Sequence, residues 1–200
     1  MRRVFGALQL RDAEGARMIE LEPRHFHCPG YYIRAASKRF EAEGAARLRH
    51  RVFVEEQGIF PAHDRDDIDL IATHLVALST YAHEADQVVG TVRIHEEAPR
   101  LWWGSRLAVD SDFRAVGRLG AELIRLAVCS ANARGCDRFL AHVQMQNVTL
   151  FKRLHWIPLE EVPIHGTPHM RMEAKLDRYP PCADPVTGWY HRPSLRKARG

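Results

Sequence analysis

Three strand-like segments follow one another directly in the middle of the chain, and a strong helix comes after them. Residues 74–80 (HLVALST), 88–94 (VVGTVRI) and 101–109 (LWWGSRLAV) are rich in β-branched and aromatic residues, with a polar hairpin turn between the first two. Apolar residues then recur at helical spacing from 119 to 134, and Gly135 is suited to end that helix. Consecutive strands without intervening helices disfavour the regular strand–helix alternation of a dinucleotide-binding fold.

The remaining periodic segments extend this pattern on both sides. Residues 31–36 are predicted as a strand and 37–55 as a helix that Ser37 or a neighbour caps. Beyond the central helix we expect a strand, a short helix and a last strand at 138–143, 147–154 and 170–176. The order β-α-β-β-β-α-β-α-β predicts a mixed α/β (α+β) fold around one central sheet, with Gly104 marking a candidate bulge.

Length and composition are those of one globular domain. Two hundred residues, 46% hydrophobic and 27% charged, are enough to bury a core. We expect an irregular N-terminal segment over 1–30, a single domain over 31–178 and a loose basic tail over 179–200, which holds much of the net charge of +4.

The same composition limits the setting in which the protein works. No apolar run reaches the roughly 20 residues that a transmembrane helix requires, and the N-terminus lacks the apolar region of an export signal. The four cysteines form no disulfide-like framework, which favours a reduced, cytoplasmic protein. We expect no membrane partner, and the modest charge gives no reason to expect nucleic acid.

The strand-to-helix turn at 107–121 has the features of an anion site. The first N–H groups of a helix have no intrahelical partners, and the helix dipole is positive at that end. Gly117 and Gly120 allow the backbone to come close to an anion, while Arg114 and Arg118 supply positive charge. A plain turn with solvated arginines would have the same local pattern, so this segment alone does not decide its role.

Two spaced motifs give this turn a more specific meaning. Val109-x4-Arg114-x-x-Gly117 resembles the acetyl-CoA loop of the GNAT (Gcn5-related) N-acetyltransferases. Residues 143–156 (VQMQNVTLFKRLHW) resemble the second signature of that superfamily, in which a strand leads into Asn and a short helix. The resemblance implies a mixed, mostly antiparallel sheet flanked by helices. It also implies transfer of acetyl from acetyl-CoA to the amine of a small-molecule metabolite, by direct attack in a ternary complex.

The resemblance also implies which residues contact the cofactor. The main chain of Leu107, Ala108 and Val109 would pair with the pantetheine arm, Asn147 would hydrogen-bond the cofactor, and Phe151 would lie near the thioester. The residues implied to hold the pyrophosphate are Arg114, Gly117, Arg118, Leu119, Gly120 and Ala121.

The chain departs from the family pattern at two positions. Leu119 stands where the family has a small residue, which implies a slightly longer loop. Phe151 replaces a tyrosine that in many relatives protonates the departing CoA thiolate. Phenylalanine donates no proton, but a thiol with a pKa of about 8.5 is a fair leaving group unaided.

More extended similarities point to two related families. Over about 25–181 the chain resembles a bacterial GNAT subfamily linked to nitrogen starvation, through HFHCPGYYIR, RVFVEEQGIF, LWWGSRLAV and FKRLHW. Other segments resemble the acyl-homoserine-lactone synthases, which use acyl-carrier protein and S-adenosylmethionine. Those segments are Arg51-Val52-Phe53, Asp64-x-Asp66-x-x-Asp69, Gly90-Thr91-Val92-Arg93 and Ser105-Arg106. A non-catalytic acyl-CoA-binding partner of pathway enzymes is a third interpretation, because Phe151 departs from the catalytic pattern.

Amine acetylation needs a group that takes a proton from the attacking nitrogen. We select Glu56 and His142 as candidates, with Glu96 and Glu97 as alternatives. His142 lies on the strand beside the expected cofactor, and an ordinary pKa near 6.5 suits a base. A strand histidine or a surface helix carboxylate without a catalytic role would give the same pattern.

Other polar and aromatic clusters leave alternatives open. The acidic run at 64–69 is either a solvated loop or an attraction for a cationic amine. The densest cluster of metal-binding residue types, at 25–28, lacks a second ligand pair at zinc spacing, so we expect no metal. Trp102 and Trp103 alternate along a strand, so one is expected in the core and the other on the opposite face. A homodimer is compatible with all of these features.

Overall fold

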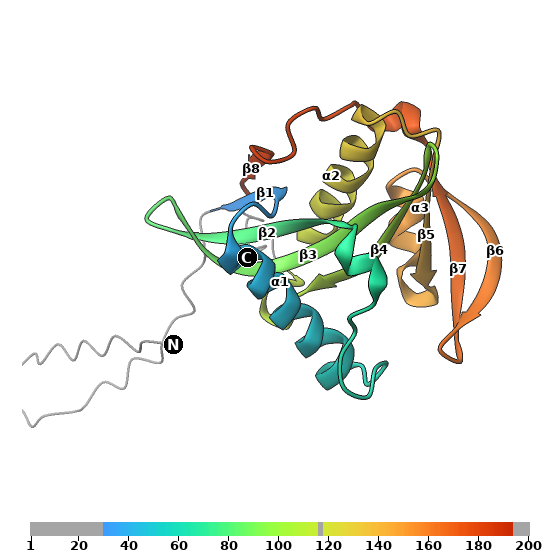
Figure 1. The fold of residues 1–200 in the computed structure, drawn as a ribbon, viewed down its shortest axis with the longest axis horizontal. Helices are drawn as coiled ribbons and strands as arrows, with labels where there is room; N and C mark the ends of the chain where they lie inside the picture. The colour runs from blue at the N-terminus through green and yellow to red at the C-terminus, as the bar shows by residue number, and fades with distance from the viewer. Residues whose placement is uncertain (1–29, 116–117, 194–200) are drawn as a thin grey trace, which may run out of the picture.

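The computed structural model describes residues 30–115 and 118–193 of the chain (Figure 1). Eight strands form one sheet in the order β6-β7-β5-β4-β3-β2-β1-β8, in which only β4 and β5 pair in parallel. The strands are β1 (Tyr31–Ala35), β2 (Thr73–Tyr81), β3 (Glu84–Ala98), β4 (Leu101–Val109), β5 (Arg138–Gln144), β6 (Trp156–Ile164), β7 (Thr167–Ala174) and β8 (Trp189–His191). This single, mostly antiparallel sheet confirms the predicted fold class.

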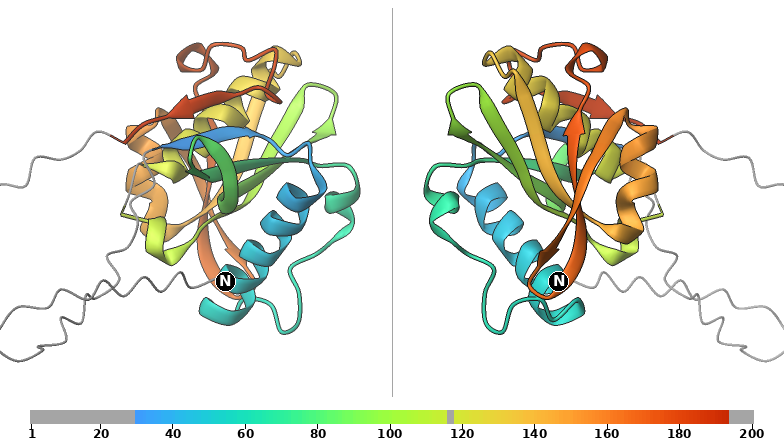
Figure 2. Two further views of the ribbon diagram at one scale, coloured as in Figure 1. Left: turned by 90° about the vertical axis from the view of Figure 1, so that its left-hand side faces the viewer. Right: turned by 90° about the vertical axis from the view of Figure 1, so that its right-hand side faces the viewer.

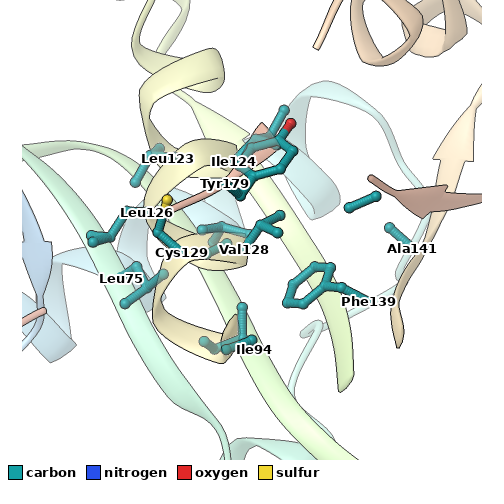
Figure 3. Packing of buried hydrophobic residues seen from close by; sticks show 14 of the residues in the cluster. Leu75, Ile94, Leu123, Ile124, Leu126, Val128, Cys129, Phe139, Ala141 and Tyr179 are labelled. Atoms are coloured by element: carbon teal, nitrogen blue, oxygen red, sulfur yellow. The ribbon is translucent and has the colours of Figure 1, made fainter. Parts of the chain in front are cut away.

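Helices cover both faces of the sheet. They are α1 (Arg39–His50), α2 (Leu119–Ala133) and α3 (Val148–Arg153). Figure 2 shows α1 and α2 on opposite sides of the strands. Because side chains alternate along a strand, Val76 and Leu78 of β2 pack with Ala45 of α1, whereas Leu75 and Ala77 belong to the larger core under α2. Part of that core is shown in Figure 3.

The first helix changes its winding rather than ending. α1 continues into a π-helical segment, η1 (Arg51–Glu56), where the N–H of Gln57 donates to the carbonyl of Val52. The predicted helix over 37–55 is therefore confirmed in extent. The remaining helical segments are short 3₁₀ turns, namely η2 (Asp67–Leu70), η3 (Ser111–Phe113), η4 (Met145–Asn147) and η5 (Leu176–Arg178).

A bulge interrupts β4, but it lies at Arg106 rather than at Gly104. Arg106 has a φ of 54°, in the left-handed region, and the β3–β4 register shifts beside it. Gly104 pairs regularly with Ile94, so the predicted position is wrong. The missing side chain of Gly104 instead makes room for an aromatic ring, because a Cβ there would lie 3.0 Å from Phe139 Cε1.

The segment after residue 178 packs against the domain. β8 pairs with β1, the N–H of Cys182 donates to the carbonyl of Cys129 on α2 at 2.9 Å, and Trp189 Nε1 donates to Glu122 at 3.0 Å. The predicted loose tail is therefore wrong for residues 179–193. The predicted N-terminal segment up to residue 29, with its histidine-cysteine cluster, and residues 194–200 lie outside the described residues. Within the described part of the chain, no helix has the length and apolar character needed to cross a bilayer.

Candidate active site

β4 and β5 pair over only part of their length. They are bonded from Leu101 opposite Arg138 to Gly104 opposite Ala141, and not beyond. The bulge at Arg106 follows directly on β4, and bulges bend a strand away from its regular course. The two strands therefore form a fork, and no described strand pairs with the edge of β4 that faces the fork over residues 107–109.

A cleft of about 1360 Å³ occupies this fork. It runs from the start of α2 to the segment after η1 and to the turn between β6 and β7. All the sequence-selected site residues that the structure describes line it, namely Glu56, Leu107, Ala108, Val109, Arg114, Arg118, Leu119, Gly120, Ala121, His142, Asn147 and Phe151. Gly117, the other selected residue, lies outside the described residues. Trp103 also lines the cleft, whereas Trp102 is buried in the core, as the alternation predicts.

One end of the cleft is the N-terminus of α2. Arg118 occupies the N-cap position in a left-handed conformation, with φ 55° and ψ 33°. The N–H of Ala121 already donates to the Arg118 carbonyl at 2.9 Å, whereas the N–H groups of Leu119 and Gly120 have no backbone partner among the described residues. Among the described residues, the first turn of the helix thus has two backbone N–H groups, at Leu119 and Gly120, that could face an anion.

The two arginines of the turn differ in their surroundings. The Arg114 guanidinium forms an ion pair with Glu56 and donates from Nε to the Val109 carbonyl at 3.0 Å. Arg118 is exposed and forms no ion pair within the described chain. Glu56 is thus held at the anion end of the cleft by Arg114, which does not favour a role as the base at the acceptor end.

The middle of the cleft is aromatic and carries no acidic hydroxyl. Phe151 is buried and packs edge-on against Trp156, with ring centroids 5.0 Å apart. Among the described residues, neither tyrosine nor cysteine lines the cleft. Asn147, at the end of η4, lines it with a carboxamide that bonds to no described residue.

The other end of the cleft has His142 and Trp103 on its floor. Their rings lie 4.7 Å apart, and the imidazole is exposed to the cleft. Partial burial lowers the pKa of His142 below its ordinary value of 6.5, and the neighbouring His169 and Arg171 lower it further. The ring is therefore neutral at pH 7 and able to accept a proton.

Two more groups lie at this end: His95, which was not selected from the sequence, and Glu97, which was selected there as an alternative base. His95 is buried, and burial followed by the charge of Arg93 lowers its pKa. Glu97 lines the cleft and accepts a hydrogen bond from Trp103 Nε1 at 2.5 Å. The alternative carboxylate, Glu96, instead accepts from the N–H of Arg100 in the β3–β4 turn and does not line the cleft.

The acidic run is neutralised by arginines. Arg49 donates to Asp64 and Asp69 at 2.5 Å each, and Arg93 holds Asp66 through two bonds of 2.5 and 2.7 Å. The hydrogen bond from Arg93 lowers the pKa of Asp66, and those from Arg49 and Arg93 hold the pKa of Asp69 well below its usual range against the effect of burial. Asp64, Asp66 and Asp69 are therefore neither solvated loop residues nor free charges that could attract a cationic amine.

The same ion cluster also holds residues 57–70 in place above the acceptor end of the cleft. The Arg106 guanidinium donates to the Asp64 carbonyl at 3.1 and 3.2 Å and lies 4.6 Å above the Phe60 ring. Phe60 in turn contacts His165 in the turn between β6 and β7, with centroids 5.0 Å apart. Residues 57–70 and this turn therefore meet above the cleft.

Comparison with known proteins agrees with this geometry. Residues 48–135 match the family model of the acetyltransferase (GNAT) domain. A crystal structure described as an N-acetyltransferase from Lactobacillus plantarum superposes with a TM-score of 0.64, at 22% identity over 73% of this chain and 98% of that chain. The fold is that of the GNAT acetyltransferases. Escherichia coli ElaA shares this GNAT fold, with a TM-score of 0.60 and 20% identity over 72% of this chain and 98% of that chain.

One GNAT-fold neighbour belongs to a different enzyme class. BjaI, a CoA-dependent acyl-homoserine lactone synthase whose structure holds SAM and isopentyl-CoA, superposes with a TM-score of 0.59. It is 21% identical over 72% of this chain and 82% of that chain. No curated protein sequence matches the chain significantly. Together the GNAT domain match and the neighbours support an acyltransferase enzyme. The described residues contain no group of three or more side chains suited to hold a metal ion.

Proposed function

We propose that the protein transfers an acyl group from acyl-CoA to the amine of a small-molecule metabolite. The observation that carries the proposal is the continuity of the cleft, which joins the start of α2, the fork between β4 and β5, and a histidine whose pKa is lowered. The three parts match the three needs of the reaction, which are an anion site, an extended channel and a proton acceptor.

The anion end fits a pyrophosphate. The N–H groups of Leu119 and Gly120 have no backbone partner in the described part of the chain, and Arg118 adds a positive charge that no described carboxylate neutralises. The edge of β4 at 107–109, which no described strand pairs, would bond the pantetheine arm as an added strand once Arg114 releases the Val109 carbonyl, and the Asn147 carboxamide would bond the arm from the opposite side. Acyl-CoA, when bound there, would supply the activated thioester.

The chemistry assigned to the chain is proton transfer and orientation. The amine nitrogen attacks the thioester carbonyl carbon, a C–N bond forms, the C–S bond breaks, and CoA leaves as the thiolate. His142 takes the proton that the nitrogen loses, because its lowered pKa keeps it neutral at pH 7. Glu97 would bind the amine as an ammonium ion, whose first proton goes to His142 before the attack, and the second proton, released as the C–N bond forms, goes to the departing thiolate. No side chain is needed to protonate the thiolate, since thiol pKa values lie near 8.5.

Turnover with acetyl-CoA and a panel of amines tests the proposal. Release of free CoA thiol that depends on the amine, together with an acetylated product in mass spectrometry, is the expected result. Binding of acetyl-CoA without thiol release with any amine, in an extract as well as in the panel, would favour a non-catalytic acyl-CoA-binding protein.

A second candidate is an acyl-homoserine-lactone-synthase-like reaction. The segments that resemble those synthases are far apart in the sequence, yet Asp66, Arg93, Ser105 and Arg106 meet in one cluster beside the cleft. BjaI, with its SAM and isopentyl-CoA, shares the fold. Methylthioadenosine formed from S-adenosylmethionine and acyl-CoA would select this reaction over amine acetylation.

We also infer a narrower setting from the sequence resemblance, namely a cytoplasmic enzyme of the bacterial GNAT subfamily linked to nitrogen starvation. The segments HFHCPGYYIR and FKRLHW support this inference. Comparison of acetylated metabolites between nitrogen-limited and nitrogen-rich cells, with and without the gene, tests it. Identical acetylated metabolites under both conditions would contradict it.

A further inference from the structure

At the acceptor end of the cleft, one face of the sheet presents a row of polar and aromatic side chains. β3, β4 and β5 are neighbours in the sheet (Figure 1), and His95 on β3 lies directly opposite Trp103 on β4. Residues paired across two strands have their side chains on the same face. Trp103 also contacts His142 of β5 and donates to the Glu97 carboxylate at 2.5 Å. The indole thus joins a carboxylate and an imidazole on one side of the sheet.

The carboxylates that line the cleft differ in whether a cation neutralises them. Among the described residues, three carboxylates line it, those of Glu56, Asp66 and Glu97. Glu56 and Asp66 are each paired with an arginine. Glu97 forms no ion pair with any described residue, and its printed partner is the uncharged N–H of Trp103. The acceptor end therefore has one carboxylate whose charge is not compensated.

The arginines near this end are already paired. The ion cluster above the acceptor end contains equal numbers of arginines and aspartates, so its charges balance. Its members are Arg49, Arg93, Arg106, Asp64, Asp66 and Asp69. The Arg93 side chain is only 1% exposed, and Arg106 is paired with Asp64 and Asp66 at 3.2 and 3.1 Å. The other described arginines of the cleft, Arg114 and Arg118, belong to the anion end.

The remaining walls of the acceptor end are neutral or apolar. Burial is the main cause of the lowered pKa of both His95 and His142, so neither imidazole carries a positive charge at pH 7. Residues 57–70 and the adjoining ends of β6 and β7 add apolar side chains to the lining. These are Ile59, Phe60, Ile68, Ile164 and Pro168. An anionic group on an acceptor would therefore meet the like charge of Glu97 and no uncompensated arginine among the described residues at this end.

We propose that the acceptor is a primary amine with an apolar body and no carboxylate, bound through its ammonium group by Glu97. This inference rests on the proposed acyl transfer, which leaves the chemistry of the acceptor open. The ammonium would compensate the charge of Glu97 beside His142, and the apolar body would lie against Trp103 and the apolar wall. An amino acid with the same side chain would bring a second negative charge close to Glu97, and like charges at an interface cost several kcal/mol.

Pairs of ligands that differ by one carboxylate test the inference. They are 2-phenylethylamine with phenylalanine and tryptamine with tryptophan. Calorimetric titration of the unmodified protein saturated with CoA gives the Kd, and thiol release from acetyl-CoA gives kcat/KM. Each amine is expected to exceed its amino acid by more than about 100-fold in both measurements. The amide of each amino acid is close to it in size but lacks the negative charge, so it should recover most of the loss.

Two neighbouring glutamates give a matched pair of variants. Glu97→Gln keeps the shape of the side chain and removes its charge, so binding of 2-phenylethylamine should weaken by about 10- to 150-fold while acetyl-CoA affinity stays. The preference for the amine over phenylalanine should shrink in the same variant. Glu96 accepts the N–H of Arg100 and does not line the cleft, so Glu96→Gln should leave amine binding unchanged. Thermal unfolding shows that both variants are folded.

The possible results separate this inference from the proposed function. Turnover of amino acids equal to that of the matched amines would overturn the inference and leave acyl transfer intact. Equal losses of amine binding in Glu96→Gln and Glu97→Gln would also overturn it, because contact with Glu97 would then not be the cause. Failure of every amine to bind would overturn it as well. Preferential binding of the amines without thiol release would support the amine site and overturn the proposed acyl transfer.

Discussion

Gly120 is the position at which stability and ligand binding should change in opposite directions. It is the second residue of α2, it lines the cleft, and its φ does not require glycine. Among the described residues, a Cβ there would contact only Val109 Cγ2, at 3.8 Å, which is ordinary van der Waals distance. Gly120→Ala is therefore expected to raise the free energy of unfolding by up to about 1 kcal/mol, because alanine is the better helix former. For a chain of this length that gain corresponds to a rise in Tm of about 2–4 °C.

The same methyl group would occupy space that an anion needs. If a phosphate accepts the N–H of Gly120, the added Cβ holds the oxygen away from it, and one charge-assisted hydrogen bond of about 1.5–3 kcal/mol is lost. That loss predicts a Kd for acetyl-CoA about 10- to 150-fold higher. Gly120→Leu should weaken binding further. Calorimetry gives the Kd, and thermal unfolding shows that the variant is folded.

Measuring Tm and Kd together gives two outcomes that would refute this reasoning. A variant with raised Tm and unchanged Kd would show that acetyl-CoA does not approach α2 at this amide. A variant with lowered Tm would show that Gly120 is needed for the fold, contrary to the open space around its Cα.

Three further predictions concern charged and titratable groups. Glu56→Gln frees the Arg114 guanidinium from a partly exposed ion pair worth about 0.2–1 kcal/mol, so CoA affinity should rise by up to about fivefold with kcat unchanged. A fall in kcat of about 100-fold would instead identify Glu56 as the base. For His142, kcat/KM should increase with pH through a pKa below 6.5 and then level off, since the neutral ring is active. His142→Gln should lose this dependence, and a retained acid limb would contradict the assignment. Asp66→Asn should destabilise the protein by about 1.5–3 kcal/mol at pH 7 in urea unfolding, because Arg93 loses a partner. Because the folded pKa of Asp66 lies below its unfolded value of about 3.9, that difference should shrink as the pH falls below 4, and a difference constant down to pH 3 would refute the pairing.

Elements with a strong local pattern were predictable from the sequence. The helix expected from 119 to 134 is α2 (Leu119–Ala133), and Gly135 follows it with a φ of 80°. The strand expected over 101–109 has the bounds of β4. In both, burial of one face or stripe imposes a period that the residues display directly.

Elements that depend on a distant partner were not predictable in this way. β6 (Trp156–Ile164) contains Pro158, Pro163 and two glutamates, which do not fit a buried strand. It is an edge strand that pairs only with β7, where proline and charge are tolerated. β8 is three residues long, and its position is set by β1 rather than by any pattern of its own.

In the candidate site too, some features follow from a local sequence pattern and others depend on a distant segment. The residues of the cofactor end follow from a contiguous turn, so their grouping in one cleft could be anticipated. The pairing of Glu56 with Arg114 joins two segments far apart in the sequence, and no local signal specifies it. His95 could have been selected from the sequence, because Arg93, His95 and Glu97 alternate along β3 and so share one face of the sheet.

The pairing of β1 with β8 has a consequence for how the protein is made. Tyr31 lies opposite His191, so this part of the sheet joins residues from nearly the whole described chain. During synthesis β1, β2 and β3 emerge early and can assemble together, whereas β8, the one described strand that pairs with the outer edge of β1, emerges after all the other described strands. An open strand edge is a site at which chains aggregate. Within the described chain, this edge of the sheet is therefore covered by a strand only when the last described strand has been made.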